Sequence, residues 1–207
     1  CVRFLIAAGC KAIVIACNTA TSVAAATLRK EIALPIVAME PALKPASMVA
    51  GDGLVLVLAT EVTLKLDKFK ALMNIYGKNA VPVPAPKLVK AVEAGMLDGE
   101  EMNALLTEYL SPWLDHTVKA VVLGCTHYVF LKRALRGFLP EHVRLIDGNE
   151  GTARQLKTRL RQLDLLGGAN EPDIRARVEF HSTKDDAQTL ARMDTLFDLA
   201  LSQLSDK

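Results

Sequence analysis

A short pattern occurs twice in this chain, and it constrains the fold more than any other feature. Residues 11–17 read KAIVIAC, and residues 119–125 read KAVVLGC. Each copy has a lysine, an alanine, three aliphatic residues that favour strands, one small residue and a cysteine. Continuous apolar runs of this kind are typical of parallel strands that are buried on both faces. The sequence therefore predicts two buried strands, each followed by a thiol.

The rest of the chain alternates between short apolar runs and segments with helical spacing. Further strands are expected at residues 36–39, 54–59, 81–83, 143–146 and 176–181, and long helices at 65–76 and 128–138. Such alternation predicts an α/β fold with parallel sheets flanked by helices. We expect two pseudo-symmetric lobes with the active site between them. Residues 1–40 and 149–207 would form the first lobe and residues 41–148 the second.

Composition excludes several classes of protein. The chain has 207 residues, 51% of them hydrophobic, and a net charge of +2, so the core is ample and an electrostatic nucleic-acid surface is not expected. No signal peptide is recognisable, and no apolar run reaches the roughly 18 residues that a membrane span needs. The four cysteines show no C-x-x-C spacing. We therefore expect free thiols, no zinc or other metal site, and a reducing, cytoplasmic location.

The two repeated cysteines stand where ligands bind in such folds. Parallel α/β sheets bind ligands at the carboxyl ends of their strands. Cys17 and Cys125 follow their strands, and each is expected just before a helix, whose free N–H groups lower the pKa of a thiol and can hold a carboxylate. Asn18, Thr19 and Thr126 supply polar donors beside them, and His127 is a candidate proton partner for Cys125.

Two thiols on opposite sides of one carbon suit a two-base racemase. One thiol would take a proton from one face, and the other would return a proton to the opposite face. No cofactor is needed if the site stabilises the carbanion electrostatically. A lone cysteine at a strand end more often only packs in the core. Here each thiol is followed by polar residues, in CNTATS and CTHY, and this favours a functional interpretation.

At these residues the chain resembles a known family. VIACNTATS at 14–22 and LGCTHY at 123–128 are similar to the two signature blocks of the glutamate racemases, in the aspartate/glutamate racemase superfamily. The resemblance continues in order through LPIVAMEPALKPA at 34–46, PKLVKAVEAG at 86–95 and LIDGNEGTARQL at 145–156. It therefore covers essentially the whole chain.

The resemblance implies cofactor-independent interconversion of L- and D-glutamate, which supplies D-glutamate for peptidoglycan in the cell wall. It implies that Cys17, Cys125 and His127 are catalytic, with Cys17 acting on D-glutamate and Cys125 on L-glutamate. By the same resemblance, the substrate-binding residues are Asn18, Thr19, Thr126 and Glu93. The partner that the resemblance implies is the small-molecule substrate glutamate, with no nucleic acid and no membrane, and glutamate racemases commonly form homodimers.

The resemblance also carries a departure and leaves alternatives open. Family members open with a D-S-G-x-G-G strand and later carry a P-Y-G block, and both would precede Cys1. We therefore expect an N-terminally truncated racemase that is poorly active as it stands. Aspartate racemisation within the same superfamily is the closest alternative, although the His in CTH favours glutamate. A binding module that keeps its thiols for structure and a redox protein are the others.

Overall fold

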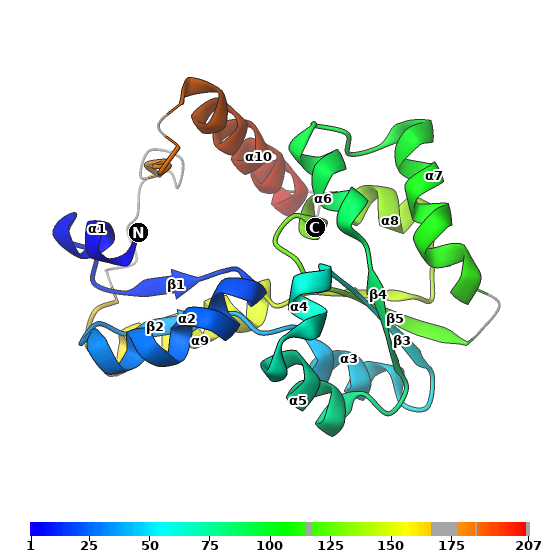
Figure 1. The fold of residues 1–207 in the computed structure, drawn as a ribbon, viewed down its shortest axis with the longest axis horizontal. Helices are drawn as coiled ribbons and strands as arrows, with labels where there is room; N and C mark the ends of the chain where they lie inside the picture. The colour runs from blue at the N-terminus through cyan, green and yellow to red at the C-terminus, as the bar shows by residue number, and fades with distance from the viewer. Residues whose placement is uncertain (115–116, 167–177, 185, 206–207) are drawn as a thin grey trace.

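The computed structural model describes residues 1–114, 117–166, 178–184 and 186–205 of an α/β protein (Figure 1). From the N-terminus the elements are α1 (Val2–Ala7), β1 (Ile13–Ile15), α2 (Asn18–Glu31), β2 (Ile36–Ala38), α3 (Leu43–Ala50), β3 (Leu54–Ala59), α4 (Glu61–Lys65), α5 (Asp67–Tyr76), β4 (Ala80–Pro84) and α6 (Pro86–Glu93). They continue with α7 (Gly99–Leu110), the 3₁₀ helix η1 (Ser111–Trp113), β5 (Val118–Leu123), the 3₁₀ helix η2 (Tyr128–Leu131), α8 (Lys132–Phe138), β6 (Arg144–Ile146), α9 (Asn149–Gln162) and α10 (Ala187–Ser205).

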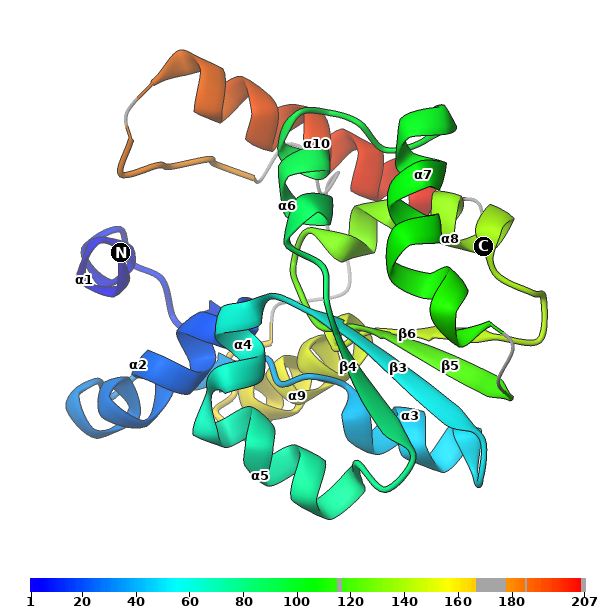
Figure 2. The same cartoon turned by 45° about the vertical axis from the view of Figure 1, so that its right-hand side comes forward.

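The larger sheet has four parallel strands in the order β4-β3-β5-β6. Alternate side chains of β3 enter two different cores. Leu56 and Leu58 pack with residues of α6, α7 and α8, whereas Val55 and Val57 pack with residues of α3 and α5. Figure 2 shows these helices on the two faces of the sheet. Because both faces are covered, β3 is apolar at every position and β5 at every position except Lys119, as buried parallel strands are expected to be.

The smaller sheet consists of β1 and β2, which pair in parallel from Ile13↔Ile36 to Ile15↔Ala38. Helices α2 and α9 pack against it. The strand expected at 176–181 is not confirmed. Residues 178–181 form no strand, and 176–177 lie outside the described residues. In the described part of the chain the two sheets therefore differ in size, since the first has two strands and the second four.

The chain crosses twice between the sheets. It leaves the smaller sheet after β2, builds the whole larger sheet, and returns from β6 to α9. This course of the chain allows the carboxyl ends of β1 and β5 to face the same space. None of the helices within the described ranges combines the length and apolar character that crossing a bilayer requires.

Two predicted helices are each broken in the structure. The segment expected as one helix at 65–76 consists of α4 and α5, because Leu66 between them is extended with φ −73° and ψ 140°. Helix α4 starts earlier than predicted because the Thr60 hydroxyl caps it and accepts a hydrogen bond from the Thr63 N–H at 3.3 Å. The segment expected as a helix at 128–138 begins as the 3₁₀ helix η2 and becomes α-helical only at Lys132.

Candidate active site

The end of β5 carries Cys125 on a turn that only glycine allows at the preceding position. The Gly124 N–H donates to the Leu58 carbonyl of β3 at 2.7 Å. A Cβ atom at Gly124 would lie 2.6 Å from that same carbonyl oxygen. The absence of a side chain therefore lets β5 stay against β3 until its end. Cys125 does not stand at the start of an α-helix, as the sequence suggested, because a turn and η2 follow it.

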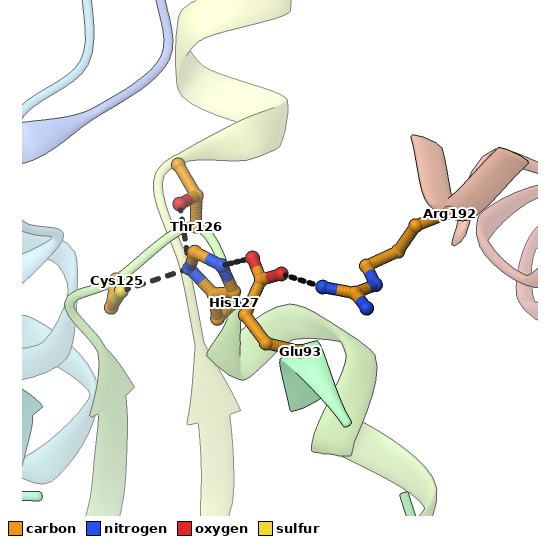
Figure 3. A network of polar contacts seen from close by, with 5 residues as sticks. All are labelled: Glu93, Cys125, Thr126, His127 and Arg192. Atoms are coloured by element: carbon orange, nitrogen blue, oxygen red, sulfur yellow. Dashed lines mark hydrogen bonds and ion pairs between the residues drawn. The ribbon is translucent and has the colours of Figure 1, made fainter. Parts of the chain in front are cut away.

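A chain of polar contacts runs outward from Cys125 (Figure 3). The Cys125 Sγ lies 3.7 Å from His127 Nδ1, and the Thr126 hydroxyl lies 3.3 Å from the same nitrogen. On the other side of the ring, His127 Nε2 is 2.6 Å from Glu93 Oε1. The second oxygen of Glu93 accepts a hydrogen bond from Arg192 Nη1 at 2.8 Å. A thiol, an imidazole, a carboxylate and a guanidinium are thus connected in sequence.

These contacts shift the pKa values of the network in a consistent direction. The hydrogen bond to Cys125, followed by that to Glu93, raises the pKa of His127 to about 9 against the effect of burial. Burial raises the pKa of the Cys125 thiol, but the hydrogen bonds and charge of His127 outweigh it, so the pKa is lowered overall. Hydrogen bonds from His127 and then Arg192 lower the pKa of Glu93. The network therefore favours a thiolate beside an imidazolium.

The second thiol comes from the smaller sheet. Cys17 follows β1 and is the N-cap residue of α2, and its side chain is exposed. The next residue, Asn18, is buried and donates from Nδ2 to the Gly124 carbonyl at 2.7 Å. Its Oδ1 has no hydrogen-bond partner among the described residues, although it is buried. Asn18 therefore joins the start of α2 to the end of β5 and keeps one acceptor available.

Two threonines that the sequence analysis did not select complete this region. Thr63 is buried in α4, and its hydroxyl lies 2.9 Å from that of Thr19 and 2.9 Å from that of Thr60. The signal was present, because Thr60 directly follows the buried strand β3 and so stands at the carboxyl edge of the sheet. Together the hydroxyls connect α2 with the larger sheet.

A pocket of about 180 Å³ lies between these groups. Its lining residues are Cys17, Asn18, Thr19, Thr60, Thr63, Val89, Gly124, Cys125, Thr126 and His127. The structure thus brings both cysteines and four further predicted site residues to one cavity. Glu93 is not among the lining residues, and its two oxygens accept hydrogen bonds from His127 and Arg192. The arrangement can offer a thiol to a small ligand from each of the two sheets.

A larger cavity, of about 580 Å³, lies where the chain crosses between the sheets. Its lining includes Glu40, Lys44, Asp147 and Arg154, and contains no cysteine or histidine among the described residues. Size alone would favour this cavity, but the reactive groups are in the smaller one. Within the part of the chain that the structure describes, no three His, Cys, Asp or Glu side chains are grouped so that they could hold a metal ion.

Comparison with known proteins decides the family. The family model described as Asp/Glu/Hydantoin racemase matches residues 1–156. This chain belongs to that family. It is 42% identical over 201 residues to a glutamate racemase of Clostridium perfringens strain ATCC 13124, an alignment that covers 96% of this chain and 76% of the relative. The glutamate racemase of strain SM101 is 49% identical over 164 residues, which are 78% of this chain.

Solved structures agree with the fold. A glutamate racemase isoform from Bacillus anthracis superposes with a TM-score of 0.69 at 29% identity, over 80% of this chain and 64% of that one. The Escherichia coli glutamate racemase, crystallised with L-glutamate and the activator UDP-MurNAc-ala, gives 0.65 at 32% identity, over 72% and 58%. The chain spans 63% of the length of the Clostridium perfringens SM101 racemase. The parallel sheets and flanking helices are thus those of glutamate racemase structures.

Proposed function

We propose that this site racemises glutamate by a two-thiol, two-base mechanism without a cofactor. The observation that carries the proposal is the presence of Cys17 and Cys125, from two different sheets, in the lining of one pocket. Relatives that share up to 49% of the aligned residues are glutamate racemases, which supports glutamate as the substrate. In this proposal the product D-glutamate serves peptidoglycan synthesis.

In the direction from L- to D-glutamate, the Cys125 thiolate removes the α-proton and becomes a thiol. The electron pair stays on the α-carbon as a carbanion-like species, and the Cys17 thiol delivers a proton to the opposite face. Cys17 is left as the thiolate, so the reverse reaction starts from the protonation state that the forward reaction leaves. The His127 imidazolium faces Cys125 at 3.7 Å and stabilises its thiolate.

The substrate-binding roles follow from the donors and acceptors around the pocket. In this proposal the ammonium group of the substrate donates to the unpartnered Oδ1 of Asn18, which is an acceptor. The hydroxyls of Thr19 and Thr126 donate to the substrate's carboxylate. Glu93, which we predicted to bind substrate, is reassigned to orient His127, since its Oε1 lies 2.6 Å from His127 Nε2. Residues 1–40 with 149–207 and residues 41–148 are the two lobes in this proposal, and α10 of the first lobe packs its Leu196 against the core of the second.

The substrate is tested by incubating the chain separately with L-glutamate, D-glutamate and both enantiomers of aspartate, followed by chiral chromatography. Conversion of both glutamate enantiomers supports the proposal. Conversion of aspartate alone would contradict it and indicate an aspartate racemase instead. A homodimer and a cytoplasmic location remain predictions, and light scattering tests the first.

A further inference from the structure

Arg192 joins the network of Cys125 from a distant part of the chain. It lies on α10, 99 residues after its partner Glu93 and outside the residues that the family model matches. Figure 3 shows its side chain extending from α10 to the carboxylate. Glu93 uses Oε2 for Arg192 at 2.8 Å and Oε1 for His127 at 2.6 Å. Each oxygen therefore has its own donor, and the carboxylate plane is fixed from both sides.

The position of Arg192 is itself determined by packing. Asp186 precedes α10 and accepts hydrogen bonds from the Thr189 N–H at 2.6 Å and the Thr189 hydroxyl at 2.8 Å, which fixes the start of the helix. Further along, Leu196 packs against the core of the larger sheet. Helix α10 thus has a capped start before Arg192 and a packing contact after it, and Figures 1 and 2 both show it beside α6.

We propose that Arg192 is a positioning residue for the Cys125 half of the reaction, because it holds Glu93 so that Glu93 holds the His127 imidazole against the thiol. The inference rests on the proposed two-thiol racemisation and deepens it. Arg192 touches neither thiol in the network, and among the described residues that network does not extend to Cys17. It therefore acts on one proton transfer and leaves the other unchanged.

The charges around Arg192 are consistent with this role. The charged groups that interact with Arg192 in the described part of the chain include Glu93 on α6 and Asp186 before α10, and the imidazolium of His127 lies on the far side of Glu93. Arg192 contributes to the lowered pKa of Glu93, after the larger effect of His127. The side chain of Arg192 is 40% exposed and that of Glu93 is 44% exposed, so solvent screens the attraction between them. We therefore expect Arg192 to act mainly by orienting the Glu93 carboxylate.

The first test compares Arg192→Gln, which removes the charge, with Arg192→Lys, which keeps it. Arg161→Gln removes the same charge from the exposed surface of α9 and is the matched control. We expect Arg192→Gln to lower kcat about tenfold, less than the ~10²-fold that a poorly placed catalytic group can cost. Arg192→Lys should recover part of the loss, and Arg161→Gln should leave kcat unchanged.

Isotope effects show which thiol is affected. Both enantiomers have the same free energy, so kcat/KM must remain equal in the two directions in every variant. With α-deuterated substrates, slower transfer at Cys125 should raise the isotope effect from L-glutamate and lower it from D-glutamate. A purely structural defect would not raise the isotope effect from one enantiomer while lowering that from the other. Equal changes in both directions, or values like those of Arg161→Gln, would overturn the inference.

A second readout does not need activity. The Nε2 proton of His127, held against Glu93 at 2.6 Å, should give a downfield NMR signal that Arg192→Gln weakens or removes and Arg161→Gln preserves. If the chain does not exchange glutamate, the proposed function is contradicted. If Arg192→Gln nevertheless loses this signal, the positioning role is supported. An unchanged signal in Arg192→Gln would contradict the positioning role whether or not the chain is active.

Discussion

At the scale of single residues, His127 decides how Cys125 behaves. The thiol is half-buried, and burial by itself would keep it protonated. The imidazole reverses this because its own pKa, about 9, keeps it positively charged at neutral pH. The charge follows from two contacts of the ring, one with the thiol and one with Glu93.

We therefore predict that His127→Gln shifts the pH dependence of Cys125 alkylation to higher pH. A lowered pKa means that the thiolate forms at lower pH than in an ordinary thiol, and the thiolate is the nucleophile. Without the imidazolium the alkylation rate of Cys125 at pH 7 should fall several-fold. Mass spectrometry of iodoacetamide-treated protein measures it, with Cys10 as the internal reference. An unchanged pH dependence would show that His127 does not control the thiol.

The sequence revealed most of the residues at this scale, but for different reasons. Cys17, Asn18 and Thr19 were found because they follow a strand directly, and the structure places all three in the pocket lining. Arg192 was not found, because nothing within α10 distinguishes it from an arginine on a solvent-exposed helix face. Only the folded chain brings it to Glu93, and no local pattern encodes a contact between residues 99 positions apart.

At the scale of elements, the junction of β5 with the following turn is the critical feature. Gly124 lies against β3 so closely that a methyl group would collide with the Leu58 carbonyl and approach the Ala59 side chain to 3.2 Å. Backbone atoms cannot move aside as a flexible side chain can. The position of Cys125 therefore depends on the absence of a side chain one residue earlier.

Gly124→Ala should destabilise the protein by about 1–3 kcal/mol, because overpacking at a backbone contact forces the strand to shift. Urea unfolding followed by circular dichroism measures this. Gly151→Ala is the matched control, since Gly151 is on the exposed side of α9 and an added Cβ would meet no atom within 4 Å. That change should stabilise the helix by about 0.5–1 kcal/mol. Equal effects of the two substitutions would contradict the proposed close approach.

Burial determined which elements could be predicted correctly from the sequence. Strand β3 was predicted with its observed bounds, because a strand covered on both faces is apolar throughout. The break between α4 and α5 was missed because the apolar spacing of 65–76 continues through Leu66. Thr60 determines where α4 begins, and a threonine directly after a strand is a helix-start signal that was not used in predicting this helix.

At the scale of the whole molecule, the pocket exists because two sheets meet. Asn18 at the start of α2 donates to the Gly124 carbonyl at the end of β5, and Thr19 contacts Thr63. These contacts hold the two thiol-bearing edges together. The sequence predicted that the edges would share a site from the repeated strand pattern, but it could not show which residues join them.

Asn18→Ala should cost about 1–3 kcal/mol of stability, since it removes a buried hydrogen bond and leaves the Gly124 carbonyl without that donor. The free energy of unfolding in urea measures the change. Asn103→Ala, the same substitution at an exposed position of α7, should have almost no destabilising effect. If both variants unfolded alike, the contact between α2 and β5 would not contribute to holding the sheets together.

The central claim is that two thiols act on opposite faces of one carbon, and loss of the α-proton in D₂O tests it most directly. L- and D-glutamate are incubated separately with the 207-residue chain and with its Cys17→Ser and Cys125→Ser variants. NMR follows the α-proton, and chiral chromatography follows configuration. We predict loss of the proton with inversion from both enantiomers, and no inversion in either cysteine variant. Inversion that survives substitution of one cysteine, or no exchange of glutamate in any form, would contradict the two-thiol mechanism.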